Sequence, residues 1–303
     1  MNFNRIPLLL SMNRAEFIRS FTLGTLGLST MSFNDLDNLL SSGKASQRMP
    51  ALFLGHGSPM NALEDNPITR VWQQLGRELP TPTAIVSISA HWMTAGKTEI
   101  TAMPLPKTIH DFGGFPKALF DVQYPAKGAP ELAAELQQEL QYTRLGHDHS
   151  WGLDHGTWSV LRHLYPKADI PVVQLSIDMQ RDGNWHYNFG KALARWRNKG
   201  VLFLGSGNLV HNLRLLDWNR PNGGYDWAIE FDAFSAQKIS TGDFGPLINF
   251  EKLGSAAKLS IPSTDHYLPL LYILGMQQAS EKTSFPVTGL QMGGISMRSV
   301  LLS

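Results

Sequence analysis

The chain has 303 residues, of which 43% are apolar and 17% charged, and its formal net charge is +1. This composition is typical of a globular protein with a sizeable core, and the lack of a basic block argues against nucleic acid or a polybasic membrane surface as partner. There is no cysteine, so disulfides, thiolate metal sites and cysteine nucleophiles are excluded. Any metal must therefore be held by His, Asp or Glu.

Residues 1–48 differ from the rest of the chain and are predicted to form an N-terminal extension. A positive stretch at 13–19 precedes an apolar stretch at 21–31, which is shorter than the roughly 20 residues that cross a bilayer. The pair is similar to a secretory or twin-arginine leader, but Ala15 stands where the second arginine would be. We expect a cytoplasmic protein without stable membrane insertion, and export to the periplasm is the alternative. A Ser-rich linker at 41–46 leads to a single domain at 49–303.

From residue 49 onward, apolar runs alternate with amphipathic segments. The pattern predicts strands at 51–54, 84–89, 98–102, 171–177 and 201–204, with closing strands at 287–292 and 296–301. It predicts helices at 67–79, 130–142, 157–165, 184–198, 226–240 and 267–274. A long loop at 107–124, which contains Phe112, Phe115 and Phe120, fits either a wall or lid of a binding site or an ordinary packed loop. We therefore predict an α/β fold with a mixed, largely parallel central sheet and helices on both faces.

Histidines follow three of the predicted strands. His56 lies in a Gly-His-Gly turn after the first strand, His91 follows the 84–89 strand, and His211 lies about a turn beyond the 201–204 strand. The segment 52–58 also echoes 202–208, which suggests two strands ending in similar tight loops at one edge. In a largely parallel sheet, that edge is where ligands bind.

Two more histidines lie beside structure that would restrain them. His266 precedes the apolar helix at 267–274, and His155 lies in a loop beside Gly156. From spacing alone, His56 and His91 fit either a shared metal site or ordinary structural roles. For the other histidines we favour structural roles: His110, His147, His149, His163 and His186. A dinucleotide loop and a serine-hydrolase elbow receive little support, since neither full motif is present.

Five longer motifs occur in a distinctive order. They are LGHGSPM at 54–60, ISAHW at 88–92, GLDHGTW at 152–158, GSGNLVHNL at 205–213 and DHYLPL at 265–270, with HDFGGF at 110–115 between the second and third. From Met49 to the C-terminus, the chain thereby resembles the class III extradiol ring-cleavage dioxygenases (LigB-like), in particular the 4,5-DOPA extradiol dioxygenase branch.

The resemblance implies a role for each matching histidine. His56 and His91 correspond to the first two metal ligands and His266 to the third. Distant members use a carboxylate as third ligand, so Asp265 is the alternative. His211 corresponds to the acid/base residue, and His155 to a residue that contacts substrate or oxygen.

The implied reaction is insertion of O₂ into a catechol ring of a DOPA-like substrate, giving a ring-opened semialdehyde. One divalent metal per chain is expected, Fe(II) for activity, with Zn(II) as the metal that an isolated preparation could carry. The same histidines would also suit a zinc-dependent hydrolase or a non-catalytic metal-binding relative, which are the alternatives.

Overall fold

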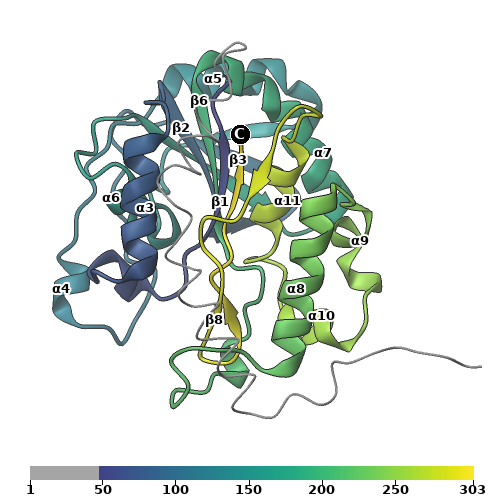
Figure 1. Ribbon diagram of the computed structural model, residues 1–303. Helices are drawn as coiled ribbons and strands as arrows, with labels where there is room; N and C mark the ends of the chain where they lie inside the picture. The colour runs from purple at the N-terminus through teal and green to yellow at the C-terminus, as the bar shows by residue number, and fades with distance from the viewer. Residues whose placement is uncertain (1–47) are drawn as a thin grey trace, which may run out of the picture.

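The computed structural model describes residues 48–303, in which a central sheet lies between two layers of helices (Figure 1). The predicted N-terminal extension, apart from residue 48, lies outside the described residues. Among the described helices, none is long and apolar enough to cross a membrane.

The strands are β1 (Ala51–Gly55), β2 (Ala84–Thr94), β3 (Thr98–Thr101), β4 (Leu145–Asp148), β5 (Val172–Asp178), β6 (Val201–Gly207), β7 (Thr283–Ser284), β8 (Leu290–Gln291), β9 (Ile295–Ser296) and β10 (Val300–Leu302). The α-helices are α3 (Pro67–Glu78), α4 (Lys117–Phe120), α5 (Pro130–Glu139), α6 (His155–Leu164), α7 (Gly183–Leu193), α8 (Asp226–Thr241), α9 (Gly245–Ile248), α10 (Ser255–Ser260) and α11 (Leu268–Gly275).

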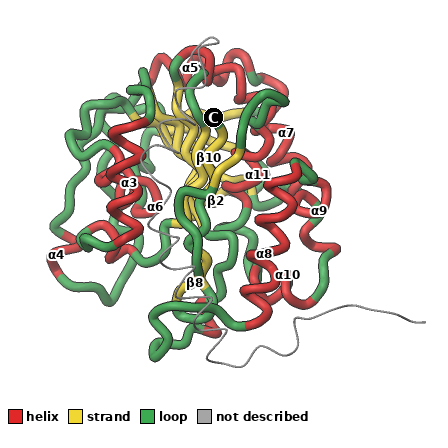
Figure 2. Tube along the Cα trace, in the orientation of Figure 1, coloured by secondary structure: helices red, strands yellow, loops and turns green. Residues whose placement is uncertain are grey.

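The large sheet has the strand order β4-β3-β5-β2-β6-β1-β10-β7. Its central strands β5, β2, β6 and β1 are parallel neighbours, whereas β3 runs antiparallel to β5, and β10 runs antiparallel to β1. Figure 2 shows these strands as one layer between the helices. The prediction of a mixed, largely parallel sheet with helices on both faces is confirmed.

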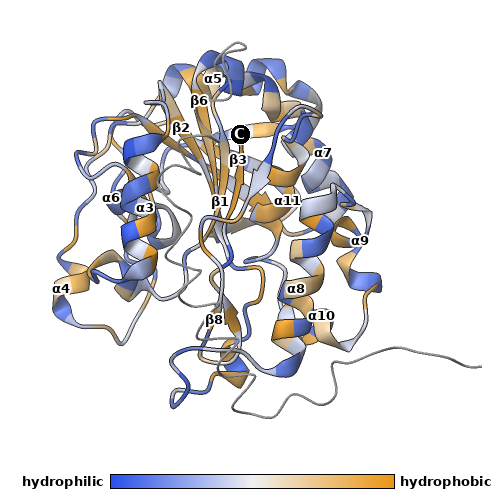
Figure 3. Ribbon diagram, in the orientation of Figure 1, coloured by the Kyte–Doolittle hydropathy of each residue, from blue (hydrophilic) through white to orange (hydrophobic). Residues whose placement is uncertain are grey.

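Side chains of the central strands alternate between two apolar cores. Phe53 of β1 belongs to the core that contains α7 and α11, whereas Leu52 and Leu54 belong to the core that contains α3 and α6. Every residue of β1 is buried, as expected for a parallel strand covered on both faces. Figure 3 shows the result: apolar strands inside, with helices that turn polar faces to solvent.

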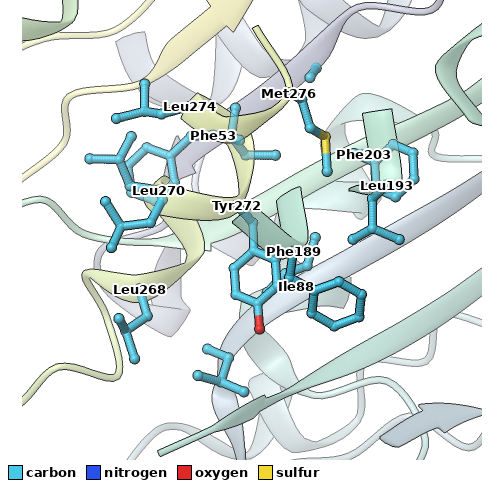
Figure 4. Packing of buried hydrophobic residues seen from close by; sticks show 14 of the residues in the cluster. Phe53, Ile88, Phe189, Leu193, Phe203, Leu268, Leu270, Tyr272, Leu274 and Met276 are labelled. Atoms are coloured by element: carbon cyan, nitrogen blue, oxygen red, sulfur yellow. The ribbon is translucent and has the colours of Figure 1, made fainter. Parts of the chain in front are cut away.

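Helix α11 is buried on all sides. All eight of its residues are buried, and Leu270, Tyr272 and Leu274 pack with Phe53, Phe189 and Phe203 from the sheet and α7 (Figure 4). A helix that is apolar all round has no solvent-facing stripe and must lie within the core. His266 directly precedes Tyr267, the N-cap of this helix, so the buried helix restricts where His266 can lie.

Several predicted boundaries were wrong by a few residues. The predicted helices 130–142 and 184–198 end as α-helices at Glu139 and Leu193 and continue as 3₁₀ turns, and the loop 107–124 contains the short α4. In place of the predicted closing strands at 287–292 and 296–301, the structure has the two-residue strands β8 and β9 and the three-residue strand β10.

Candidate metal centre

The carboxyl edge of the parallel strands gathers the predicted histidines. His56 follows β1, and its backbone N–H donates to the Gly207 carbonyl at the end of β6, 3.0 Å away. Strands β1 and β6 are neighbours with Gly55 opposite Gly207, so the two similar loops do lie side by side. The turn also needs glycine at residue 57, where φ is +61° and a Cβ would lie 2.7 Å from the sulfur of Met297.

His91 lies within β2 rather than after it, which corrects the predicted strand end at residue 89. Ile88 and Met93 are five residues apart on β2, but their partners Leu175 and Ile177 on β5 are only two apart. The strand therefore carries an irregular bulge at His91. Such bulges redirect side chains beside active sites, and this one turns His91 toward His56.

His155 is the first residue of α6 and not part of a loop, which is a second correction. Asp154 is the N-cap of this helix, and its carboxylate accepts from the backbone N–H of Thr157 at 3.1 Å. Burial, assisted by the charge of Asp111, raises the pKa of Asp154 to about 6. The capped helix start fixes the direction in which His155 enters the site.

His56, His91 and His266 offer ring nitrogens that all lie within 4.8 Å of one another. The Nε2 atoms of His56 and His91 are 3.2 Å apart. Two nitrogens bound to one ion at about 2.1 Å, with an angle between about 90° and 109°, would be separated by about 3.0–3.4 Å. The observed spacing therefore fits shared coordination, and three imidazoles suit a divalent transition metal.

The outer ring nitrogens of these three residues each face an oxygen. Nδ1 of His56 lies 2.9 Å from Ser206 Oγ, and the Ser206 hydroxyl lies 2.5 Å from the Gly156 carbonyl, to which it must donate. Ser206 Oγ is therefore the acceptor for an Nδ1–H of His56, which leaves the lone pair on Nε2. Outer-shell partners of this kind orient histidine ligands.

The carboxylates of the site lie behind the imidazoles. Asp265 Oδ2 forms a short contact with Nδ1 of His266, and Asp111 Oδ2 lies 3.4 Å from Nδ1 of His91. These carboxylates complete two further triads with metal-binding potential, His91–Asp111–His155 and His211–Asp265–His266, each of which shares a histidine with the first triad. We interpret Asp111 and Asp265 as residues that orient the three histidines rather than as ligands, because each carboxylate lies beside the Nδ1 atom of one of those histidines.

Burial keeps the clustered imidazoles neutral. Together with the neighbouring imidazoles, it holds the pKa of His56 and of His266 well below the usual range and lowers the pKa of His91 to about 3. It also lowers the pKa of His211 to about 4. A neutral imidazole has a free lone pair, so each of these rings can serve as a ligand or as a proton acceptor at pH 7.

His211 and His155 flank the three gathered histidines on different sides. The His211 ring stacks on that of His266 with centroids 3.5 Å apart and planes within 9°. The His155 ring lies 3.9 Å from that of His91, and Phe112 of the long loop meets it edge-on at 5.4 Å. Phe115 and Phe120 pack around Phe112, so this loop forms an aromatic wall beside the site.

Other histidines have structural partners, in keeping with the roles favoured above. His110 and His163 contact the carbonyl oxygens of Val122 and Asn61, at 2.9 and 2.7 Å, and His186 contacts the Tyr272 hydroxyl at 2.9 Å. His163 also borders a surface hollow of about 490 Å³. The residues that line this hollow come from α3, α6 and nearby loops and do not include the gathered histidines His56, His91 and His266.

The family described as "Catalytic LigB subunit of aromatic ring-opening dioxygenase" matches residues 50–300. The chain belongs to this family. A protein of Escherichia coli K12 named "4,5-DOPA dioxygenase extradiol" is 50% identical over 260 residues, which cover 84% of this chain and 95% of that protein. A Beta vulgaris protein of the same name is 35% identical over 238 residues, 76% of this chain and 87% of its own length.

A solved structure agrees with the fold. A crystal structure titled as an uncharacterized protein from Escherichia coli K12 matches with a TM-score of 0.75 and 44% identity, covering 84% of this chain and all of that one. The chain is thus an extradiol ring-cleavage dioxygenase of the LigB family, whose members use a metal. The comparisons give no support to the hydrolase or the non-catalytic alternative.

Sequence reasoning missed three polar residues of the site: Asp111, Asp154 and Ser206. Asp111 and Ser206 lie inside the quoted motifs HDFGGF and GSGNLVHNL, but the sequence does not show which histidines they meet. Asp154 had a usable signal, because an acidic residue directly before a helix is a common N-cap.

Proposed function

We propose that this dioxygenase opens the ring of a DOPA-like catechol with O₂ and that Fe(II) is its working metal. The observation that carries the proposal is the convergence of His56, His91 and His266, whose outer nitrogens face Ser206, Asp111 and Asp265. The name of the relatives, "4,5-DOPA dioxygenase extradiol", supports the choice of substrate.

His56, His91 and His266 would hold the metal through Nε2. A redox-capable ion held on one face by three neutral imidazoles keeps positions free for catechol oxygens and O₂ and keeps its positive charge, which favours catecholate. Zn(II) binds such sites well but has no redox chemistry, so a zinc-loaded preparation would be inactive. Asp265 acts through His266, because its carboxylate meets Nδ1 of that ring.

His211 is the proton acceptor for the catechol hydroxyl in this proposal. Its ring is half-buried and stacks on the ring of His266, one of the proposed ligands. Burial keeps it neutral at pH 7, so it can take a proton from the substrate and return one later. Within the part of the chain that the structure describes, no side-chain hydrogen bond occupies its ring nitrogens.

His155 would contact the bound substrate or O₂. It is 5% exposed, and its Nδ1 is 2.9 Å from Asp111 Oδ2, which leaves Nε2 for the site. Phe112, edge-on to His155, supplies an apolar surface against which an aromatic substrate ring can pack.

The test is anaerobic reconstitution with Fe(II), followed by oxygen uptake and absorbance change with L-DOPA and a panel of catechols. We expect stoichiometric O₂ consumption and a yellow ring-opened product. Inactivity with every catechol, together with ester or amide hydrolysis by the zinc form, would overturn the proposal.

Variants then separate the roles of the histidines. His56→Ala and His91→Ala should lose the metal, whereas His211→Ala should keep the metal and lose turnover. His149→Ala is the matched control, since His149 is exposed on the turn after β4. Loss of metal from His211→Ala would reassign that residue as a ligand.

For the compartment, we keep the cytoplasm as the proposal, since Ala15 replaces the arginine that a twin-arginine leader requires. Cell fractionation with N-terminal sequencing tests it. A shortened chain in the periplasm would establish export instead.

A further inference from the structure

Asp111 contacts two site histidines with a single carboxylate. Its Oδ2 lies 2.9 Å from Nδ1 of His155 and 3.4 Å from Nδ1 of His91, and its Oδ1 accepts from the backbone N–H of His155 at 2.9 Å. The two imidazole rings lie next to each other, with centroids 3.9 Å apart. One side chain thus faces both a predicted metal ligand and a predicted substrate-contacting histidine.

The backbone that carries Asp111 is tied down beside α6. The N–H of Ile109 donates to the Leu153 carbonyl at 2.7 Å, and the indole N–H of Trp158 donates to the Ile109 carbonyl at 2.8 Å. These bonds join the loop to the segments on both sides of His155. The carboxylate is therefore held in place before any ligand binds.

A carboxylate at this point determines which nitrogen of the His155 ring carries the proton. An ionised carboxylate can only accept, so the Nδ1 of His155, which is hydrogen-bonded to Asp111 at 2.9 Å, is a donor. A neutral imidazole has one N–H, and Nε2 of His155 must then carry the free lone pair, which makes it an acceptor toward the substrate. The Nδ1 of His91, 3.4 Å from the same oxygen, experiences the charge of Asp111 rather than a hydrogen bond.

We propose that Asp111 is a positioning residue that fixes the Nδ1–H tautomer of His155. Its charge also lies beside the metal ligand His91, so one substitution should disturb both the substrate side and the metal side of the site. The inference rests on the proposed function for the roles of the two histidines, but its test does not require turnover.

The experiment measures imidazole tautomers by long-range ¹H–¹⁵N NMR on the full-length, metal-free chain at pH 7. In the wild type, we expect His155 to carry the proton on Nδ1. In Asp111→Asn, the amide oxygen can still accept from the His155 backbone, and the NH₂ group then faces Nδ1 of His155. Because NH₂ donates, the proton should move to Nε2 of that ring.

The same variant should bind Zn²⁺ more weakly by about 10–100-fold in a chelator competition, the usual effect of removing an outer-shell partner. Asp121→Asn is the matched control, since Asp121 is an exposed acid of the same loop that pairs with Lys117. It should change neither the His155 tautomer nor the affinity. Asp111→Glu, which restores the carboxylate, should recover the Nδ1–H tautomer of His155 at least in part.

A wild-type protein with the proton on Nε2 of His155 would overturn the inference, even if Asp111→Asn did not fold. So would an unchanged His155 tautomer or unchanged Zn²⁺ affinity in a folded Asp111→Asn. A protein that shows the expected tautomer but turns over no catechol would keep this inference and refute the proposed substrate.

Discussion

Gly156, the second residue of α6, is a position where one methyl group is predicted to disturb the metal site and leave the fold intact. A Cβ at residue 156 would lie 2.8 Å from Cδ2 of His91 and would also overlap the Ser89 hydroxyl. An ordinary carbon–carbon contact is about 3.5 Å, so the His91 ring would have to shift by about 0.7 Å. The ring has little room to retreat, because it is packed against His155 and faces Asp111.

A shift of this size exceeds the tolerance of about 0.2 Å that a metal–ligand distance allows. We therefore expect Gly156→Ala to weaken Zn²⁺ binding by at least the roughly 10–100-fold that follows loss of an outer-shell partner. Overpacking costs about 1–3 kcal/mol, but alanine favours a helix over glycine by up to about 1 kcal/mol. The net loss of stability should be about 0–3 kcal/mol, or a few degrees in Tm.

The assay is chelator competition for Zn²⁺ beside thermal unfolding of the metal-free protein. Gly245→Ala is the matched control, since Gly245 begins α9 and its nearest neighbour would be 3.9 Å from the added Cβ. Wild-type affinity in a folded Gly156→Ala would refute the reasoning that close packing behind His91 fixes the ligand.

Three further predictions concern stability and the support of the ligands. Burial lowers the pKa of His211 to about 4, so the unfolded chain binds more protons than the folded one between pH 6.5 and 4. Stability of the metal-free protein should therefore fall as the pH drops below 6.5, by about 2 kcal/mol at pH 5 from this group alone, measured by urea unfolding. Ser206→Ala removes the acceptor of the His56 Nδ1–H and should lower Zn²⁺ affinity about 10-fold or more, and an unchanged affinity would contradict the assigned tautomer. Arg197→Met should destabilise the fold by about 3–5 kcal/mol in the same urea assay, because it leaves the carboxylate of Glu281 without its buried partner.

The central strands and the position of His56 could be predicted because the signals are local. Short apolar runs such as 51–54 and 201–204 are typical of strands in a sheet that is covered on both faces. The Gly-His-Gly turn marks the end of the first run. The echo between 52–58 and 202–208 predicted a shared edge, and β1 and β6 are in fact parallel neighbours. Local sequence was sufficient to predict these two strands because their residues both favour extended backbone and are buried in the sheet.

The setting of His91 could not be predicted, since it depends on pairing between distant strands. The bulge arises because β2 and β5 fall out of register after Ile88, and β5 begins far along the chain at Val172. Asp111 was missed for the same reason: it meets His155 from 44 residues away. The start of α6, by contrast, was missed although Asp154 gave a local N-cap signal.

We propose that the Nε2 atoms of His56, His91 and His266 together hold the working metal. The decisive measurement is anomalous diffraction at the iron edge, from crystals of the full-length chain reconstituted with Fe(II) without oxygen. We expect one iron peak with the three Nε2 atoms at about 2.0–2.2 Å and the carboxylate of Asp265 not coordinated. An iron bound instead by Asp265, or by His155 with Asp111, would contradict it.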